Sequence, residues 1–203
     1  MISFWKQASR RTAMALCICL LATALVACDD SGGNTTSAPT PPPIPTVTYQ
    51  AYQGTGFTLN YPTTWGVHAS GDQVTFADPV GKNLLAVFAD PDLAGEPDAE
   101  VVAKQTMDRL KSSLLANAQD MNVPLTFNTS EGRVTWIQLG ATGTMANLDP
   151  GVQGDLFLLV TNFPPQSKHT VTYQIEYYGP AKTFGQANVI FMNMLQSFAF
   201  TTQ

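Results

Sequence analysis

The chain has 203 residues, about the size of one domain plus accessory segments, and 44 % of them are hydrophobic, which is typical of a globular protein rather than a disordered one. Only 12 % are charged, and the formal net charge is −5. Nucleic-acid binding needs clustered basic residues, so this composition excludes nucleic acid as a partner.

The first 27 residues have the composition of a secretion signal. Lys6, Arg10 and Arg11 give a positive start, and a run without charge follows from Thr12 to Ala27. As a helix this run would be about 24 Å long, which is shorter than the ~30 Å hydrocarbon core of a bilayer. We therefore expect a cleaved signal peptide over residues 1–27. The alternative is an uncleaved membrane anchor.

The run ends in Leu25-Val26-Ala27-Cys28, which resembles the lipobox of bacterial lipoproteins. The resemblance implies that the Cys28 sulfur carries a diacylglycerol, that cleavage follows Ala27, and that the new amino terminus is open to acylation. Two or more acyl chains anchor a protein stably. We expect an extracytoplasmic protein of the cell envelope, lipid-anchored to a bacterial membrane. The alternative is an ordinary signal peptide followed by an incidental cysteine.

The three cysteines are Cys17, Cys19 and Cys28. Cys17 and Cys19 would leave with the signal peptide, and Cys28 would carry the lipid. The mature chain would then have no thiol for a disulfide, a zinc site or a nucleophile. Loss of the leader would also remove three of the ten basic residues and none of the fifteen acidic ones. The remaining acidic chain would not bind an anionic membrane surface by charge.

Residues 28–46 are predicted to form a lipidated, disordered linker rich in proline, serine and threonine. This stretch has almost no apolar side chains whose burial could offset the entropy of ordering. Pro41, Pro42, Pro43 and Pro45 favour extended polyproline geometry in its second half. Its expected task is to hold a domain away from the bilayer. The alternative, a ligand for an SH3-type domain, needs a partner class that is unusual outside bacterial cells.

Residues 47–203 are predicted to form one globular domain, which would bury roughly 68 to 70 % of its unfolded surface. Alternation of hydrophobic and polar residues predicts half-buried strands, and continuous apolar runs predict central strands covered on both faces. The first group comprises 57–61, 74–76, 125–127, 133–139 and 170–178, and the second comprises 83–89 and 155–161. In 170–178 one face carries Val171, Tyr173, Ile175 and Tyr177.

Two helices are predicted to cover the strands. The first begins at Glu96-Pro97, where proline suits the first helical position and nearby acidic residues favour the positive end of the helix dipole. The second begins at Gly179-Pro180, and residues 196–200 are predicted to return as a short strand. The apolar stripes are Ala103, Met107, Leu110, Leu114 and Ala118 in the first helix, and Phe184, Ala187, Phe191, Met194 and Leu195 in the second. This order predicts an α+β domain with an antiparallel sheet.

The segment Gly56-Phe57-Thr58-Leu59-Asn60-Tyr61-Pro62, followed by Trp65, is similar to the start of PsbP-like domains, and Met194-Leu195-Gln196-Ser197-Phe198 is similar to their end. The resemblance covers nearly all of residues 47–201. It implies an α/β/α sandwich in which helices flank a central antiparallel sheet. PsbP, the Ran-binding Mog proteins and many bacterial lipoproteins share this shape but no common reaction, so the resemblance implies a noncatalytic binding or accessory role. The core is expected to contain Phe57, Tyr61, Trp65 and Phe198, with Pro62 ending a strand.

Catalytic and metal-binding patterns are missing or incomplete. Residues 28–203 contain no Gly-x-Ser-x-Gly, Ser-x-x-Lys or His-Glu-x-x-His motif, and the two histidines, His68 and His169, lie far apart in the sequence. Residues 90–96 begin like a calcium loop, but Ala94 and Val101 stand where oxygen ligands are needed, which predicts an acidic turn instead. We expect no catalytic residue, no metal site and no cofactor.

The leading hypothesis is therefore a binding or accessory protein. Its expected partners are the membrane, through the lipid on Cys28, and an envelope protein or a small molecule bound beside the sheet. A second hypothesis is a cell-envelope enzyme that uses scattered carboxylates such as Asp78, Asp149 and Asp155, and a third is a structural spacer without a specific ligand. A raised carboxyl pKa in a deep pocket would favour the enzyme.

Overall fold

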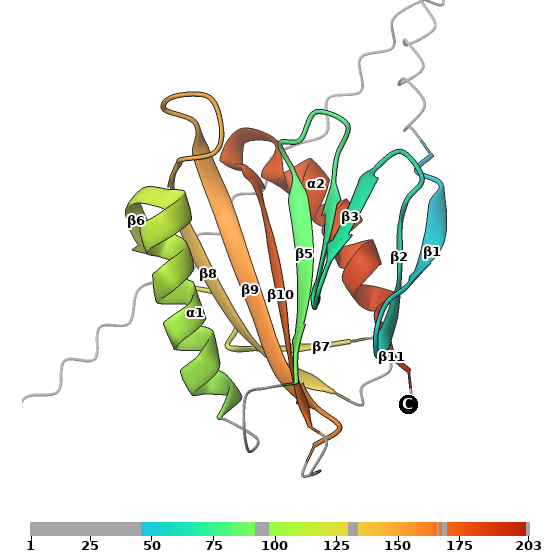
Figure 1. Cartoon of the computed structure of the whole chain (residues 1–203). Coiled ribbons are helices and arrows are strands. Elements are labelled where there is room, and N and C mark those ends of the chain that lie inside the picture. Colours follow the sequence, from blue (N-terminus) through green and yellow to red (C-terminus); the bar gives the residue numbers. More distant parts are fainter. Residues whose placement is uncertain (1–45, 92–97, 130–133, 166, 168–169, 202–203) are drawn as a thin grey trace, which may run out of the picture. The chain divides into compact units, whose positions relative to one another are not determined.

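The computed structural model describes residues 46–91, 98–129, 134–165, 167 and 170–201. The predicted leader, Cys28, and the linker up to residue 45 lie outside the described residues, as do Glu96-Pro97 and His169. The elements, drawn in Figure 1, are β1 (Tyr49–Gln53), β2 (Phe57–Pro62), β3 (Gly66–Ser70), β4 (Gln73–Ala77), β5 (Leu84–Asp90), α1 (Ala99–Leu114), β6 (Leu115–Asp120), β7 (Thr126–Asn128), β8 (Thr135–Met145), β9 (Gln153–Phe163), β10 (Val171–Pro180), α2 (Ala181–Gln196) and β11 (Ala199–Phe200).

The strands form two sheets, and every pairing between described strands is antiparallel. The larger sheet has the order β3-β4-β5-β10-β9-β8-β6, with β7 also paired to β8, and the smaller sheet has the order β1-β2-β11. The two apolar runs predicted as central strands become β5 and β9, which lie on either side of β10. This confirms that prediction.

Alternate residues of β9 pack into two different hydrophobic cores, one on each face of the larger sheet. Leu156, Leu158 and Val160 lie in the core that contains the buried residues of α1. Leu159 lies in the core that contains the buried residues of α2, and the ring of Phe157 stacks on Phe184 at 5.4 Å. Because successive side chains of a strand point to opposite faces, the two helices cover opposite faces of the sheet (Figure 1).

The α+β class, with an antiparallel sheet and two helices, is therefore confirmed. The predicted α/β/α sandwich, in which helices alone flank the central sheet, needs one correction. Helix α2 shares its face of the larger sheet with the smaller sheet. Phe57 of β2 stacks on Phe198 at 5.2 Å and meets Tyr173 of β10 edge-on at 6.4 Å. These aromatic contacts join the smaller sheet to the core under α2.

Helix α1 begins after Asp98, whose side chain accepts a hydrogen bond from the Glu100 N–H at 2.9 Å. The helical stripe was predicted to reach Ala118, and this part of the prediction is wrong. The chain becomes extended at Leu115, which pairs with Met145 of β8 and is 7 % exposed. Burial of Leu115 and pairing with β8 outweigh the local helical pattern.

The predicted core residues Phe57, Trp65 and Phe198 are buried, whereas Tyr61 is half-buried and its hydroxyl accepts a hydrogen bond from Gln50. The five residues of the predicted α2 stripe are the five that the helix buries. Among the described residues, no helix has both the length and the apolarity needed to cross a membrane.

Candidate functional site

Helix α1 has a groove along each of its two sides. The first, the Arg109 groove, lies between α1 and the strands β5 and β10 and has a volume of about 350 Å³. The second, the Lys111 groove, lies between α1, the edge of β8 and residues 120–125, and has a volume of about 320 Å³. Both volumes are large enough for a small ligand.

The Arg109 groove is lined by Asp90, Val102, Gln105, Thr106, Arg109 and Gln174. The Thr106 hydroxyl donates a hydrogen bond to the Gln174 side-chain carbonyl at 2.9 Å, which ties α1 to β10 at the floor of the groove. Gln105 and Arg109 are exposed at its mouth. The groove therefore has a polar floor, and its charged lining residues are Arg109 and Asp90.

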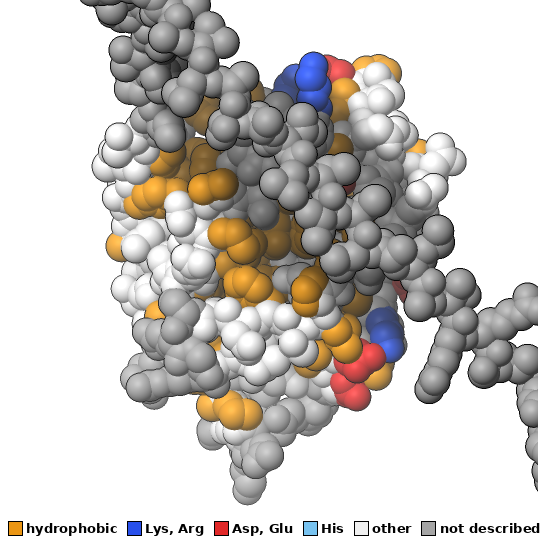
Figure 2. Space-filling view, turned by 180° about the vertical axis from the view of Figure 1, so that it is seen from behind, with side chains coloured by type: hydrophobic (Ala, Val, Ile, Leu, Met, Phe, Trp, Pro, Cys, Tyr) orange, Lys and Arg blue, Asp and Glu red, His pale blue; other side chains and the backbone are white. Residues whose placement is uncertain are grey.

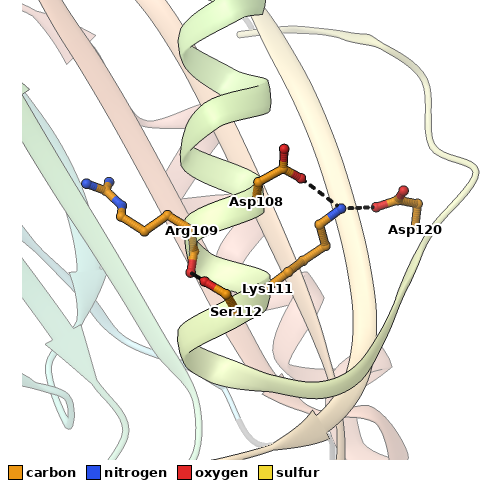
Figure 3. A network of polar contacts seen from close by, with 5 residues as sticks. All are labelled: Asp108, Arg109, Lys111, Ser112 and Asp120. Atoms are coloured by element: carbon orange, nitrogen blue, oxygen red, sulfur yellow. Dashed lines mark hydrogen bonds and ion pairs between the residues drawn. The ribbon is translucent and has the colours of Figure 1, made fainter.

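The Arg109 guanidinium makes no ion pair or hydrogen bond with another described residue. In Figure 3 the Arg109 side chain points away from the Asp108, Lys111 and Asp120 side chains. A guanidinium group offers several donors in a planar fork that matches carboxylate and phosphate oxygens. Arg109 is thus available to an acidic group on a ligand.

Glu176 of β10 lies on the same face of the sheet as Gln174, two residues away. Its neighbours across the sheet are Ala86 of β5 and Leu158 of β9, and both of these residues are fully buried. This apolar setting raises the pKa of the Glu176 carboxyl group to about 7, although the positive charge of Arg109 acts to lower it. Near neutral pH the carboxyl group therefore exists in both protonation states.

The other side of α1 differs because its charges are paired within the chain. The Lys111 ammonium lies 2.9 Å from Asp120 and 3.1 Å from Asp108, and Lys104 pairs with Glu100 (Figure 3 shows the Lys111 pairs). The hydrogen bond to Asp120 raises the pKa of Lys111 most, and the hydrogen bond to Asp108 raises it further. A charged ligand would have to compete with these ion pairs.

The carboxylates considered for an enzyme are not assembled into one site. Asp78 accepts hydrogen bonds from the Lys82 backbone N–H at 2.8 Å and from the Asn83 amide at 2.6 Å. Asp149 pairs with the Lys82 ammonium at 3.2 Å. Asp155 joins neither of them through a hydrogen bond or ion pair. Within the described ranges, no group of three or more histidine, cysteine, aspartate or glutamate residues is placed to hold a metal ion.

The remaining candidate residues lie away from the two grooves or outside the described residues. His68 is exposed on the edge strand β3, whereas His169 and residues 92–96 of the acidic turn lie outside the described residues. On the face opposite that of Figure 1, the acidic and basic side chains drawn lie near the margins of the view, and hydrophobic side chains gather near the middle (Figure 2).

Sequence reasoning did not single out Arg109 or Glu176. A signal for Glu176 was present, because placing Val171, Tyr173, Ile175 and Tyr177 on one face leaves Thr172, Gln174 and Glu176 on the other. A charged residue on a central strand is unusual and marks a buried ionisable group. Arg109 had no comparable signal, since an arginine on a helix is common at any exposed position.

Comparison with known proteins supports the fold. No family model and no curated protein matches the sequence. Among solved structures, the Ran-binding protein Mog1p of Saccharomyces cerevisiae matches with a TM-score of 0.50 at 10 % identity, over 76 % of this chain and 96 % of Mog1p. The chain has the same fold as Mog1p, which is the fold that the resemblance to PsbP-like domains implies.

Two further solved structures are similar at lower TM-scores. LpqN of Mycobacterium tuberculosis, described as involved in cell envelope biogenesis, has a TM-score of 0.49 at 13 % identity over 77 % of this chain and 92 % of LpqN. Cyanobacterial PsbP of Synechocystis has a TM-score of 0.45 at 14 % identity over 82 % of this chain and 99 % of that protein. At sequence identities this low, no site residue can be assigned to this chain from these proteins.

Proposed function

We propose that this chain is a lipid-anchored extracytoplasmic protein whose PsbP-like domain has a noncatalytic binding or accessory role. Residues 1–27 act as the signal peptide, Cys28 carries the lipid, and residues 28–46 form the linker to the domain. The resemblance of Leu25-Val26-Ala27-Cys28 to the lipobox supports the anchor. The membrane is then one partner, and a ligand or protein of the cell envelope is the other.

The observation that carries the binding role is the Arg109 groove. Its guanidinium has no ion-pair partner within the described part of the chain, and the floor beside it is held in place by the bond between Thr106 and Gln174. Preorganised polar groups around a free cation favour a ligand or protein segment with an acidic group. We infer that such a group binds at Arg109.

A second candidate function, an envelope enzyme, has one observation in its favour. Glu176 has the raised pKa that suits a general acid or base. However, no hydrogen bond joins its carboxyl group to a second acid, base or nucleophile among the described residues. One carboxyl group without such a partner is a weak basis for acid–base catalysis, so the binding role remains our proposal.

The lipid anchor can be tested with Cys28→Ser. Because the attached lipid needs the cysteine sulfur, the variant should lose metabolic labelling by radioactive fatty acid completely and should accumulate as a precursor or be released from the membrane fraction. Ala27→Gly provides a control that keeps the sulfur and a small residue at the cleavage site, and it should be labelled. Labelling of Cys28→Ser equal to that of the unchanged chain would contradict the anchor.

A further inference from the structure

The Lys111 groove contains a gap in the hydrogen-bond ladder of β8. After β6, residues 121–125 continue along the edge of β8 with two backbone hydrogen bonds. The Met121 N–H donates to the Gly140 carbonyl at 2.9 Å, and the Gln138 N–H donates to the Leu125 carbonyl at 2.6 Å. Between these two bonds β8 advances by two residues and the covering segment by four, so the segment bulges away from the strand.

The bulge leaves two backbone groups of β8 without a hydrogen-bond partner among the described residues. In an antiparallel pair, opposed residues normally exchange two hydrogen bonds. Here the Met121 carbonyl accepts from the Val123 N–H at 3.1 Å, within its own segment. Neither the Gly140 N–H nor the Gln138 carbonyl bonds to residues 121–125. In a strand, the N–H and C=O of one residue point to the same side. The Gly140 N–H therefore points to the same edge as the bonded Gly140 carbonyl, and the Gln138 carbonyl points to the same edge as the bonded Gln138 N–H.

These groups belong to the wall of the groove. Gln138, Leu139 and Gly140 all line the Lys111 groove, and the Gln138 side chain, only 9 % exposed as a residue, makes no hydrogen bond with the described part of the chain. Polar groups without a hydrogen-bond partner at a largely buried wall cost free energy. A ligand that pairs them therefore gains more than it would on an open surface.

The rest of the wall defines what such a ligand carries. Apolar side chains of Met107, Met121, Val123, Leu125 and Leu139 surround the gap. The charges at the rim, on Lys104, Lys111, Asp108 and Asp120, are all used in ion pairs within the chain. The groove thus favours a neutral group with an apolar side chain over an ion.

We infer that the Lys111 groove binds one extended peptide residue with an apolar side chain, whose N–H donates to the Gln138 carbonyl and whose C=O accepts from the Gly140 N–H. A single residue can make both bonds, as each residue of a parallel strand does with the two residues that flank its neighbour. This site lies on the opposite side of α1 from the Arg109 groove and is independent of the function proposed there.

The test uses N-acetyl-leucine N-methylamide as the probe and the 15N-labelled full chain in detergent micelles. Binding should move the Gly140 amide proton downfield in a saturable manner, because that N–H gains an acceptor. A second probe, methylated on the leucine nitrogen, cannot donate to the Gln138 carbonyl. It should bind at least about tenfold more weakly, which corresponds to the loss of one hydrogen bond in a site of this kind.

Two variants separate the groove from nonspecific binding. Leu125→Glu puts a charge on an apolar wall residue that is 46 % exposed, and it should weaken binding of the leucine probe about tenfold or more. Val189→Glu makes the same kind of change at a 61 % exposed valine of α2 and should leave binding unchanged. Absence of a Gly140 shift at millimolar probe would overturn the inference. Equal affinity for the two probes would also overturn the inference. It would mean that the groove binds the probes as an apolar cavity and that water, rather than the probe, occupies the gap in the hydrogen-bond ladder.

Discussion

Phe191→Ala is expected to lower the free energy of unfolding by about 3 to 5 kcal/mol, because it removes a fully buried aromatic ring and leaves a cavity. The Phe191 ring is 0 % exposed and lies between elements that are distant in sequence. It meets Trp65 edge-on at 5.7 Å, Tyr177 of β10 at 4.9 Å and Phe184 of α2 at 5.9 Å. Chemical denaturation followed by tryptophan fluorescence measures the change.

Val189→Ala is the matched control, since Val189 lies on the same helix and is 61 % exposed. Its expected effect is within about 0.5 kcal/mol, as for most surface substitutions. A loss of less than about 1 kcal/mol for Phe191→Ala would mean that α2 does not pack on the larger sheet as described.

Glu176→Gln is expected to change the pH dependence of stability. The folded-state pKa of Glu176 is raised from 4.5 to about 7, so the folded protein holds a proton that the unfolded chain loses at lower pH. The stability of the unchanged protein should therefore fall as pH rises from about 4.5 to 7, and the size of the shift corresponds to about 3 kcal/mol. The glutamine variant stays neutral and should lack this decrease.

At pH 8 Glu176→Gln should thus unfold at a higher denaturant concentration than the unchanged protein, whereas at pH 4 the two should agree within about 0.5 kcal/mol. Asp149→Asn is the control, because the Asp149 side chain is 75 % exposed and pairs with Lys82 at the surface. It should leave the difference between pH 4 and pH 8 unchanged. Equal pH profiles for Glu176→Gln and the unchanged protein would show that Glu176 is well solvated.

Those parts of the fold that depend on hydrophobic periodicity could be predicted from the sequence. The α2 stripe from Phe184 to Leu195 and the apolar runs of β5 and β9 bury enough surface to set the local structure by themselves. Other elements lack such a pattern. β3 has five exposed residues, so no alternation marks it, and β6 depends on pairing with β8 rather than on its own composition. Nonlocal pairing of this kind leaves no periodic signal in a single sequence.

The candidate site was harder to predict for a related reason. Arg109 and Glu176 lie far apart in the chain, and they become neighbours only because α1 packs on β8 and β9, next to β10, on one face of the sheet. The gap in the β8 ladder arises where residues 121–125 bulge away from β8, and no periodic pattern in the sequence marks it. Cys28 differs from these residues, since its proposed role rests on a short local sequence and needs no tertiary contact.

Site-specific photocrosslinking from the Arg109 groove tests the proposed binding role most directly. The full chain, with benzoylphenylalanine in place of Gln105 at the groove mouth, is expressed in its native cells and irradiated. We predict a discrete crosslinked product that Arg109→Ala reduces about tenfold, as expected for the loss of a charge-assisted hydrogen bond. The same probe at the exposed Gln186 of α2 should give no such product. Crosslinks of equal yield from both positions, or a Gln105 product that persists in Arg109→Ala, would contradict binding at this groove.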